Sequence, residues 1–193
     1  MGKELIVESR CEQLTEEKLS WATSINPSFT VAIGLEAYDD EVLRFHVNKG
    51  FTIKSWDKAV ENLRKFDLRI KTYLMFKPPF MSEKDALVHG VKWIKDVASR
   101  SDEISVNPMN IQRGTIIDRL HRHNEYRPPW LWSLVEMIKQ AHPHIHPKGG
   151  VNGSPDQVSR LIIHPTAGGK IRGAHNCGSC DKFVVAAIER YAV

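Results

Sequence analysis

The stretch "FTVAIGLE" at residues 29–36 is apolar almost throughout and ends in a glycine, a leucine and a carboxylate. A short continuous apolar run of this kind is typical of a strand that is buried on both faces, as the strands of parallel sheets are. A helical pattern follows over residues 39–50, and Gly50 is expected to end it. The stretch therefore predicts one strand–helix unit of a parallel α/β fold.

The same alternation continues on both sides of this unit. The other expected strands are residues 4–10, 68–79, 103–108 and 159–165. The other expected helices are residues 15–25, 55–67 with Ser55 as cap, 82–100, 130–140 and 179–192. Repeated strand–helix units predict a parallel sheet with helices outside it, which either curls as part of a barrel or winds as an open sheet.

Length and composition set the class of protein. The chain has 193 residues, 41% of them hydrophobic, which suits one domain of ordinary size. No apolar run approaches the roughly 20 residues that span a bilayer, and no signal peptide opens the chain, so we expect no membrane association. Three cysteines do not make a disulfide framework, which indicates a reducing, cytoplasmic compartment.

The charge balance is mildly basic. The net charge is +4 and the isoelectric point is about 9.0, which suits an anionic partner such as tRNA. The basic residues are scattered and form no tail. A small basic cluster at Arg119, His121, Arg122 and His123 has two interpretations: a solvated helix end, which is favoured, and a phosphate contact.

Polar residues follow the ends of four predicted strands. They are Glu8, Ser9 and Arg10 after the first, Glu36 after the second, Lys77 after the third, and Asn107, Asn110, Gln112 and Arg113 around the fourth. In parallel α/β barrels the chemistry sits at the carboxyl ends of the strands. Each residue alone could cap a helix or form a salt bridge, but together they favour a ligand site.

Several segments resemble the radical S-adenosylmethionine superfamily, and within it the archaeosine-biosynthesis family of the elongator-like branch. The resemblance rests on Gly-Leu-Glu at 34–36 with Asn-Lys-Gly at 48–50, Lys-Pro-Pro-Phe at 77–80 and Asn-Pro-Met-Asn at 107–110. It extends to "YRPPWLWSLVEMIK" and to "HNCGSCDKFVVAAIERY" near the carboxyl end. It implies a partial parallel (β/α) barrel over residues 1–128, carrying strands three to six, and a carboxyl-terminal extension over 129–193.

The resemblance also implies cofactors, site residues and partners. The cofactors would be S-adenosylmethionine and a [4Fe–4S] cluster. The reaction would be archaeosine formation in tRNA from a lysine-modified 7-deazaguanine, alongside a lysine-transferring archaeosine synthase. The cofactor-binding residues would be Glu8, Arg10, Glu36, Lys77 and Asn107, with Glu36 on the ribose hydroxyls and backbone near Phe76 and Lys77 on adenine. Residues facing the tRNA base would be Asn110, Gln112 and Arg113.

One family feature is missing from this sequence. The Cys-x3-Cys-x-x-Cys loop that holds the cluster does not occur, and neither does the glycine-rich turn of the second family strand. We therefore expect the chain to be inactive by itself and to work with an amino-terminal, cluster-bearing chain or segment. A split subunit, a truncated product and a start codon placed too late all fit. The alternatives in function are a non-catalytic, metal-stapled scaffold or binding module, and a relic.

The carboxyl-terminal segment holds a second candidate site. Cys177 and Cys180 stand three residues apart before a helix, with His175 just before them and His164 at the end of the last predicted strand. Thiolates and imidazoles are the ligands that zinc prefers. The hypothesis is a zinc or auxiliary iron site made by both cysteines and one or two of the histidines. The alternative is a pair of reduced cysteines, one of which caps the helix.

Overall fold

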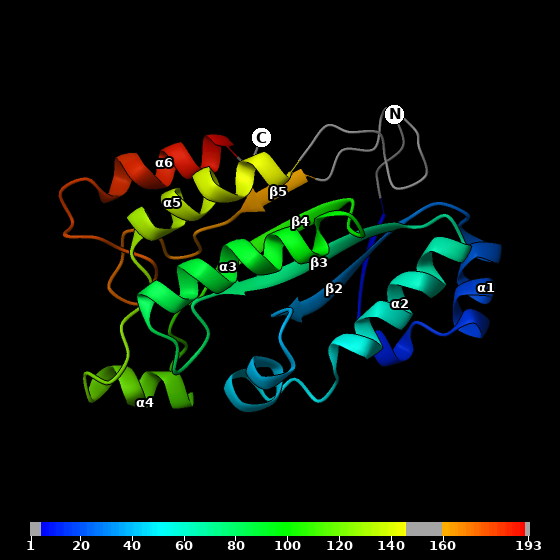
Figure 1. Cartoon of the computed structure of the whole chain (residues 1–193), viewed down its shortest axis with the longest axis horizontal. Coiled ribbons are helices and arrows are strands. Elements are labelled where there is room, and N and C mark those ends of the chain that lie inside the picture. The colour runs from blue at the N-terminus through cyan, green and yellow to red at the C-terminus, as the bar shows by residue number, and fades with distance from the viewer. Residues whose placement is uncertain (1–4, 146–159, 192–193) are drawn as a thin grey trace.

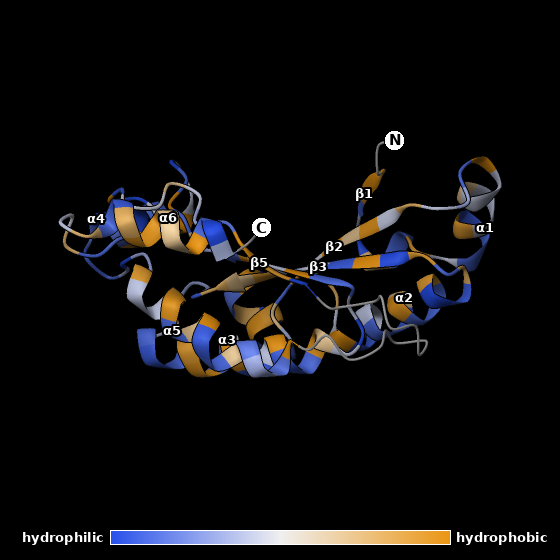
Figure 2. Cartoon of the chain, turned by 90° about the horizontal axis from the view of Figure 1, so that it is seen from above, coloured by the Kyte–Doolittle hydropathy of each residue, from blue (hydrophilic) through white to orange (hydrophobic). Residues whose placement is uncertain are grey.

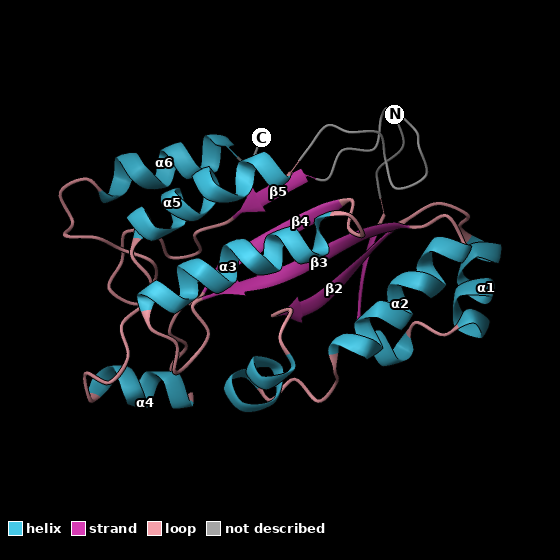
Figure 3. Ribbon diagram, viewed as in Figure 1, coloured by secondary structure: helices cyan, strands magenta, loops and turns pink. Residues whose placement is uncertain are grey.

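The computed structural model describes residues 5–145 and 160–191. A five-stranded sheet runs through this part of the chain, in the order β1-β2-β3-β4-β5, and every neighbouring pair is parallel. The arrows in Figure 3 accordingly point the same way. The strands are β1 (Ile6–Ser9), β2 (Thr30–Glu36), β3 (Arg69–Phe76), β4 (Glu103–Pro108) and β5 (Arg160–Ile163). The predicted parallel α/β fold is thus confirmed.

Helices connect the strands (Figure 1). The α-helices are α1 (Glu16–Ile25), α2 (Ile53–Lys65), α3 (Glu83–Ala98), α4 (Ile116–Arg122), α5 (Leu131–Ala141) and α6 (Asp181–Tyr191). Shorter helical turns are η1 (Cys11–Gln13), η2 (Val42–Val47) and η3 (His142–His144). Figure 2 shows α2, α3 and α5 along one side of the sheet, whereas the other side is open between β1 and α6. The sheet is therefore a partial barrel with one helix-covered face.

Alternation along the strands assigns side chains to the two faces. In β3, Ile70, Thr72, Leu74 and Phe76 are buried, and the residues between them are partly exposed. The buried set packs against amphipathic helices, of which α2 contributes Trp56 and Leu63 and α3 contributes Trp93 and Ile94. The core therefore lies between sheet and helices, and the inner face is left to polar groups.

Close packing of α3 depends on a glycine. A Cβ atom at Gly90 would lie 3.1 Å from Phe76 Cδ2 and 3.2 Å from Met137 Sδ. Gly90 therefore lets α3 approach β3 and α5 together.

Two helix boundaries differ from the sequence-based expectation. The helix expected over 39–50 is a π-helix over Val42–Val47, and it ends at Asn48, whose φ of 52° is left-handed, before Gly50 is reached. Asn tolerates that conformation, so the turn starts two residues early. The cap of α2 is Thr52, and Ser55 lies one turn inside as its capping-box partner.

The extension beyond residue 128 joins the same architecture. Its strand β5 pairs with β4, and its helix α5 packs on α3. The division at residue 128 stays a prediction.

Candidate functional site

A polar pocket of about 610 Å³ lies on the inner face, at the carboxyl ends of the first strands. This volume lies within the range of small-molecule and cofactor sites. Its lining comes from the ends of β1, β2 and β4 and from the middle of β3. The lining residues are Glu8, Ser9, Arg10, Ala32, Gly34, Glu36, Tyr73 and Asn107.

Glu36 is held in the pocket by an unusual backbone and by one ion pair. Its φ is 72°, a left-handed value that is uncommon outside glycine and asparagine, and the register between β2 and β3 shifts there. Its Oε1 lies 2.9 Å from Lys49 Nζ, and each of the two side chains is 19% exposed. Strained backbone of this kind clusters at functional sites, which makes Glu36 the leading candidate ligand group.

Gly34 leaves the room that this pair occupies. A Cβ atom at Gly34 would lie 2.9 Å from Glu36 Oε1 and 3.1 Å from Lys49 Nζ. Any larger residue would displace the carboxylate, so the glycine is part of the site.

The Asn-Lys-Gly loop brings a second cation to the rim. Arg10 donates a hydrogen bond of 3.1 Å from its guanidinium to the carbonyl of Lys49. The ring of Phe51 lies 5.6 Å from the Arg10 guanidinium carbon and 5.7 Å from Lys49 Nζ. The loop thus connects the end of β1 with the end of β2.

The inner face below the rim carries paired charges. Tyr73 donates a hydrogen bond of 3.2 Å to Glu8, and burial raises the pKa of its phenol. Lys71 Nζ lies 2.5 Å from Glu103 Oε1, and both side chains are largely covered. Polar groups therefore continue from the pocket along the open face, as expected for a surface that meets a polar ligand.

Four of the predicted cofactor-binding residues meet in this pocket: Glu8, Arg10, Glu36 and Asn107. Sequence reasoning missed Gly34, Lys49 and Tyr73. Lys49 lies in a loop thirteen residues after the carboxylate it pairs with, and no local pattern links the two. Tyr73 sits in mid-strand, where only strand pairing brings it beside Glu8.

The side chain of Lys77 lies away from the pocket, and the predicted adenine contact by the backbone near Phe76 and Lys77 stays a prediction. Its side chain is buried, ion-paired with Glu83 at 2.8 Å, and donates a hydrogen bond of 2.9 Å to the carbonyl of Arg127. It does not line the pocket. Its ammonium points into the packing between β3, α3 and the segment before α5, because Glu83 and the Arg127 carbonyl supply the acceptors there. We therefore assign this side chain a structural place.

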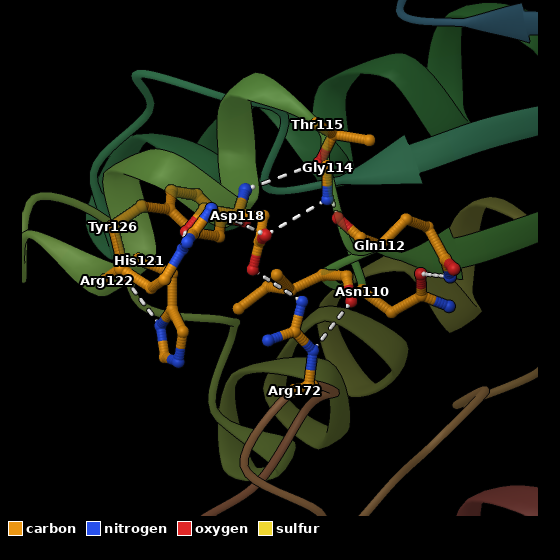
Figure 4. Close-up of polar contacts among 10 residues, drawn as sticks. Asn110, Gln112, Gly114, Thr115, Asp118, His121, Arg122, Tyr126 and Arg172 are labelled. Atoms are coloured by element: carbon orange, nitrogen blue, oxygen red, sulfur yellow. Dashed lines mark hydrogen bonds and ion pairs between the residues drawn. The ribbon is translucent and has the colours of Figure 1, made fainter.

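The three predicted base-facing residues lie beyond the end of β4 and do not line the pocket. Gln112 donates a hydrogen bond of 2.6 Å to Asn110 (Figure 4). Arg113 is exposed. Their substrate role stays a prediction.

The carboxyl-terminal cysteines stand on a preformed loop. Asp181 accepts hydrogen bonds from the backbone of Asn176 and Gly178, at 3.0 and 3.1 Å. Hydrogen bonds from the Ser179 backbone and hydroxyl lower the pKa of the exposed Cys177. Cys180 is half-buried and receives the side-chain amide of Asn176 at 3.6 Å.

The predicted metal ligands do not come together as a set. His175 Nδ1 lies 2.8 Å from the carbonyl of Gly173, and His164 lines a separate cavity of about 430 Å³ with Lys170 and Glu189. In the described part of the chain, no three His, Cys, Asp or Glu side chains are grouped as metal ligands. A site with Cys177, Cys180, His164 and His175 is thus not supported by this geometry, and the zinc or iron assignment stays a prediction beside that of two reduced cysteines.

The three cysteines do not match an iron–sulfur cluster. Cys11 is buried in the core, where burial raises the pKa of its thiol to about 12. The other two lie in the loop before α6, and no described group of three thiols exists. The pocket residues fit an organic cofactor, whereas the cysteines of this chain do not fit the cluster.

These features define a class of protein. An open parallel sheet with a polar pocket at the carboxyl ends of its strands is a partial (β/α) barrel. The archaeal Elp3 of Methanocaldococcus infernus, solved with an amino-terminal deletion, has this fold: the structures align with a TM-score of 0.71 and 18% identity, over 97% of this chain and 42% of that one.

Sequence comparison leads to particular relatives. The chain is 36% identical over 194 residues to archaeosine synthase subunit beta of Methanosarcina acetivorans, covering 98% of this chain and 52% of that protein. It is also 36% identical over 193 residues to the protein of the same name from Thermococcus kodakarensis, covering 98% and 56%. The resemblance predicted from the sequence is confirmed, and the chain spans about half the length of these relatives.

Two further comparisons complete the description. No family model matches the chain. Within residues 5–145 and 160–191, no helix is both long and apolar enough to cross a bilayer.

Proposed function

We propose that this chain is the substrate-side part of a radical S-adenosylmethionine enzyme that modifies tRNA in archaeosine formation. The observation that carries the proposal is the Glu36 pocket, on a chain related over 98% of its length to archaeosine synthase subunit beta. The free cysteines among the described residues suit a cytoplasmic setting, where thiols stay reduced.

The pocket residues supply recognition of the cofactor. The Glu36 carboxylate, oriented by Lys49, accepts hydrogen bonds from ribose hydroxyls, and Asn107 offers an amide from β4, two strands away. Arg10 places a positive charge at the rim, and Glu8 keeps Tyr73 in place. When bound, the [4Fe–4S] cluster would supply the electron that cleaves S-adenosylmethionine. Its thiolates would come from an amino-terminal chain or segment.

Among the residues that the structure describes, β1 has a free edge, and this is where that segment would dock. β1 pairs with β2 on one side, and its residues Ile6 and Val7 are 48% and 40% exposed. Beside it, an apolar cavity of about 430 Å³ is lined by Val7, Leu14, Leu19, Phe29 and Val31, under a Trp21 that is 69% exposed. Open edges accept further strands, and exposed apolar patches mark contact surfaces. A half-barrel that adds a parallel strand would cover both.

The same edge supports a second candidate, a non-catalytic scaffold that binds a catalytic partner. Both candidates use the β1 edge, and they differ only in whether Glu36 touches the cofactor. The names of the relatives describe them as one subunit of archaeosine synthase. Another subunit of that enzyme is therefore a proposed partner for both candidate functions.

The test is reconstitution. The chain is co-expressed with the amino-terminal half of the Methanosarcina acetivorans relative, and 5′-deoxyadenosine is measured under anaerobic, reducing conditions. We expect none from the chain alone and formation by the complex. Glu36→Gln should reduce the rate on the order of a hundredfold, since it removes a charge-assisted hydrogen bond from the site. Glu61→Gln, on the outer face of α2, is the matched control.

Assembly is measured separately, by co-purification. Trp21→Glu should abolish it without unfolding the chain, because Trp21 is mostly exposed. A complex that assembles and cleaves S-adenosylmethionine equally well with Glu36→Gln would refute the catalytic proposal and leave the scaffold.

A further inference from the structure

The positive charge of this chain is concentrated in two segments. Residues 109–130 and 164–180 together hold six Lys or Arg and two Asp or Glu, a net charge of +4. The whole chain also has a net charge of +4, so the remaining residues are balanced. The two segments follow β4 and β5, at the same edge of the sheet as the pocket.

The two segments are joined around Asp118. Arg172 donates a hydrogen bond of 2.7 Å to Asp118 Oδ1 and a second of 3.1 Å to the carbonyl of Ile111 (Figure 4). The Ile111 amide in turn donates to the carbonyl of Arg172 at 2.7 Å. Asp118 is buried and also accepts from Gly114 and Arg122, at 3.0 and 3.1 Å. These contacts hold α4 and the loop after β5 side by side.

We call these contacts of Asp118 with Arg172, Arg122 and Gly114 the Asp118 clamp. The clamp uses one of the two acidic residues in these segments and leaves several cations exposed. Arg113, Arg119 and Lys170 are exposed, and their side chains make no ion pair with another described residue. Arg122 contacts Asp118, yet its side chain is 67% exposed. We call Arg113, Arg119, Arg122 and Lys170 the basic rim.

Several basic side chains elsewhere form partly or largely buried ion pairs. Lys49, Lys71 and Lys77 are bound to glutamates, and Arg64 and Arg100 to aspartates. Pairing neutralises a surface, whereas unpaired cations held on one edge create a positive field. The basic rim gathers exposed cations on two neighbouring segments, and this grouping is an alternative to the interpretation of α4 as a solvated helix end.

We propose that the basic rim binds the phosphate backbone of RNA. This inference rests on the proposed function. It adds the place where the tRNA backbone is held while a base reaches the pocket. Three of the four groups are arginines, whose guanidinium donors match phosphate oxygens in pairs. Arg119 and Arg122 stand three residues apart and so share one face of α4.

The experiment measures binding of a fluorescently labelled, unmodified tRNA transcript to the chain at several salt concentrations. The rim variant is Arg113→Gln with Arg119→Gln and Lys170→Gln, which leaves the Asp118 clamp intact. Each lost phosphate contact lowers the dependence of log K on log salt by about 1, so the slope should fall by about 2 to 3. Affinity at low salt should fall on the order of tenfold or more.

The matched control removes the same charge from the helix-covered face: Lys58→Gln with Lys92→Gln and Lys95→Gln. It should keep the wild-type slope, and both variants should keep the wild-type thermal midpoint. An unchanged slope in the rim variant overturns the proposal, and so does an equal loss in the control. Loss of an acidic protein partner without loss of RNA binding also overturns it.

The two proposals fail separately. Formation of 5′-deoxyadenosine without tRNA should be unaffected in the rim variant. If the reconstituted complex cleaves no S-adenosylmethionine but the rim variant loses salt-dependent RNA binding, the proposed function fails and the rim stands.

Discussion

The Lys77 ammonium lies 2.8 Å from Oε2 of Glu83, and this pair of a buried lysine and a half-buried glutamate ties the end of β3 to the start of α3. The other carboxylate oxygen, Oε1, accepts the backbone N–H of Trp130 at 2.9 Å. Tyr126 donates a hydrogen bond of 2.8 Å to the Lys77 carbonyl. One lysine and one glutamate thus fix three elements around the edge of the sheet that carries the pocket.

Replacing Lys77 by Met should destabilise the protein by about 3 kcal/mol, because it leaves Glu83 without its cation. Adding Glu83→Gln should recover part of the loss, since Gln keeps an acceptor for Trp130 and carries no charge. Urea unfolding of the two variants measures both effects. A Lys77→Met protein as stable as the wild type would show that the pair contributes nothing.

Gly34→Ala should damage the pocket more than the fold. Its Cβ would press on the Glu36 carboxylate and the Lys49 ammonium, both of which are side-chain ends that can move. We expect 5′-deoxyadenosine formation in the reconstituted complex to fall at least tenfold, with little change in thermal midpoint. Gly114→Ala is the comparison. Its φ of 78° strains any side chain, but no atom would lie within 4 Å of the added Cβ. The substitution should therefore cost about 1 kcal/mol of stability and leave the activity unchanged.

The three thiols should react in a set order. Hydrogen bonds from Ser179 lower the pKa of the exposed Cys177, whereas burial raises that of Cys11 to about 12. At neutral pH, iodoacetamide followed by peptide mass spectrometry should label Cys177 first and leave Cys11 unmodified until the protein unfolds. Early labelling of Cys11 would mean that η1 opens in the native state.

Stability should depend on the ionisation of Asp118. The hydrogen bond from Arg172, with one from the Gly114 amide, lowers the pKa of this carboxyl below its ordinary value. Its contribution is therefore present above the unfolded-state pKa, near 4, and is lost as the pH falls through the lower folded value. The thermal midpoint of Asp118→Asn should be below that of the wild type at pH 7, and the gap should close towards pH 3. A constant gap would mean that shape and not charge holds the clamp.

Local patterns predicted most of the elements and part of the site. The run of buried residues in β2 is a local signal, and it was interpreted correctly. Glu8, Arg10, Glu36 and Asn107 could be predicted to meet because parallel strands bring their carboxyl ends to one edge.

Other features were beyond the reach of such patterns. The early end at Asn48 depends on a left-handed residue that competes with the more obvious Gly50. In the described residues, Cys177 and Cys180 have no third metal ligand beside them. The course of the loops in space decides which side chains meet, and the spacing of residues in the sequence does not show that course.

The sequence by itself determined the parallel α/β class, the position of polar residues at the ends of strands and the resemblance to the archaeosine-biosynthesis family, because hydrophobic period and motif order are written along the chain. Only the tertiary structure decided which charges are neutralised. It buried Lys77 against Glu83, paired Lys49 with Glu36, and used Asp118 to join two distant segments and leave the basic rim uncovered. Ion pairing depends on distance in space, and residues as far apart as 118 and 172 acquire that distance only when the chain folds.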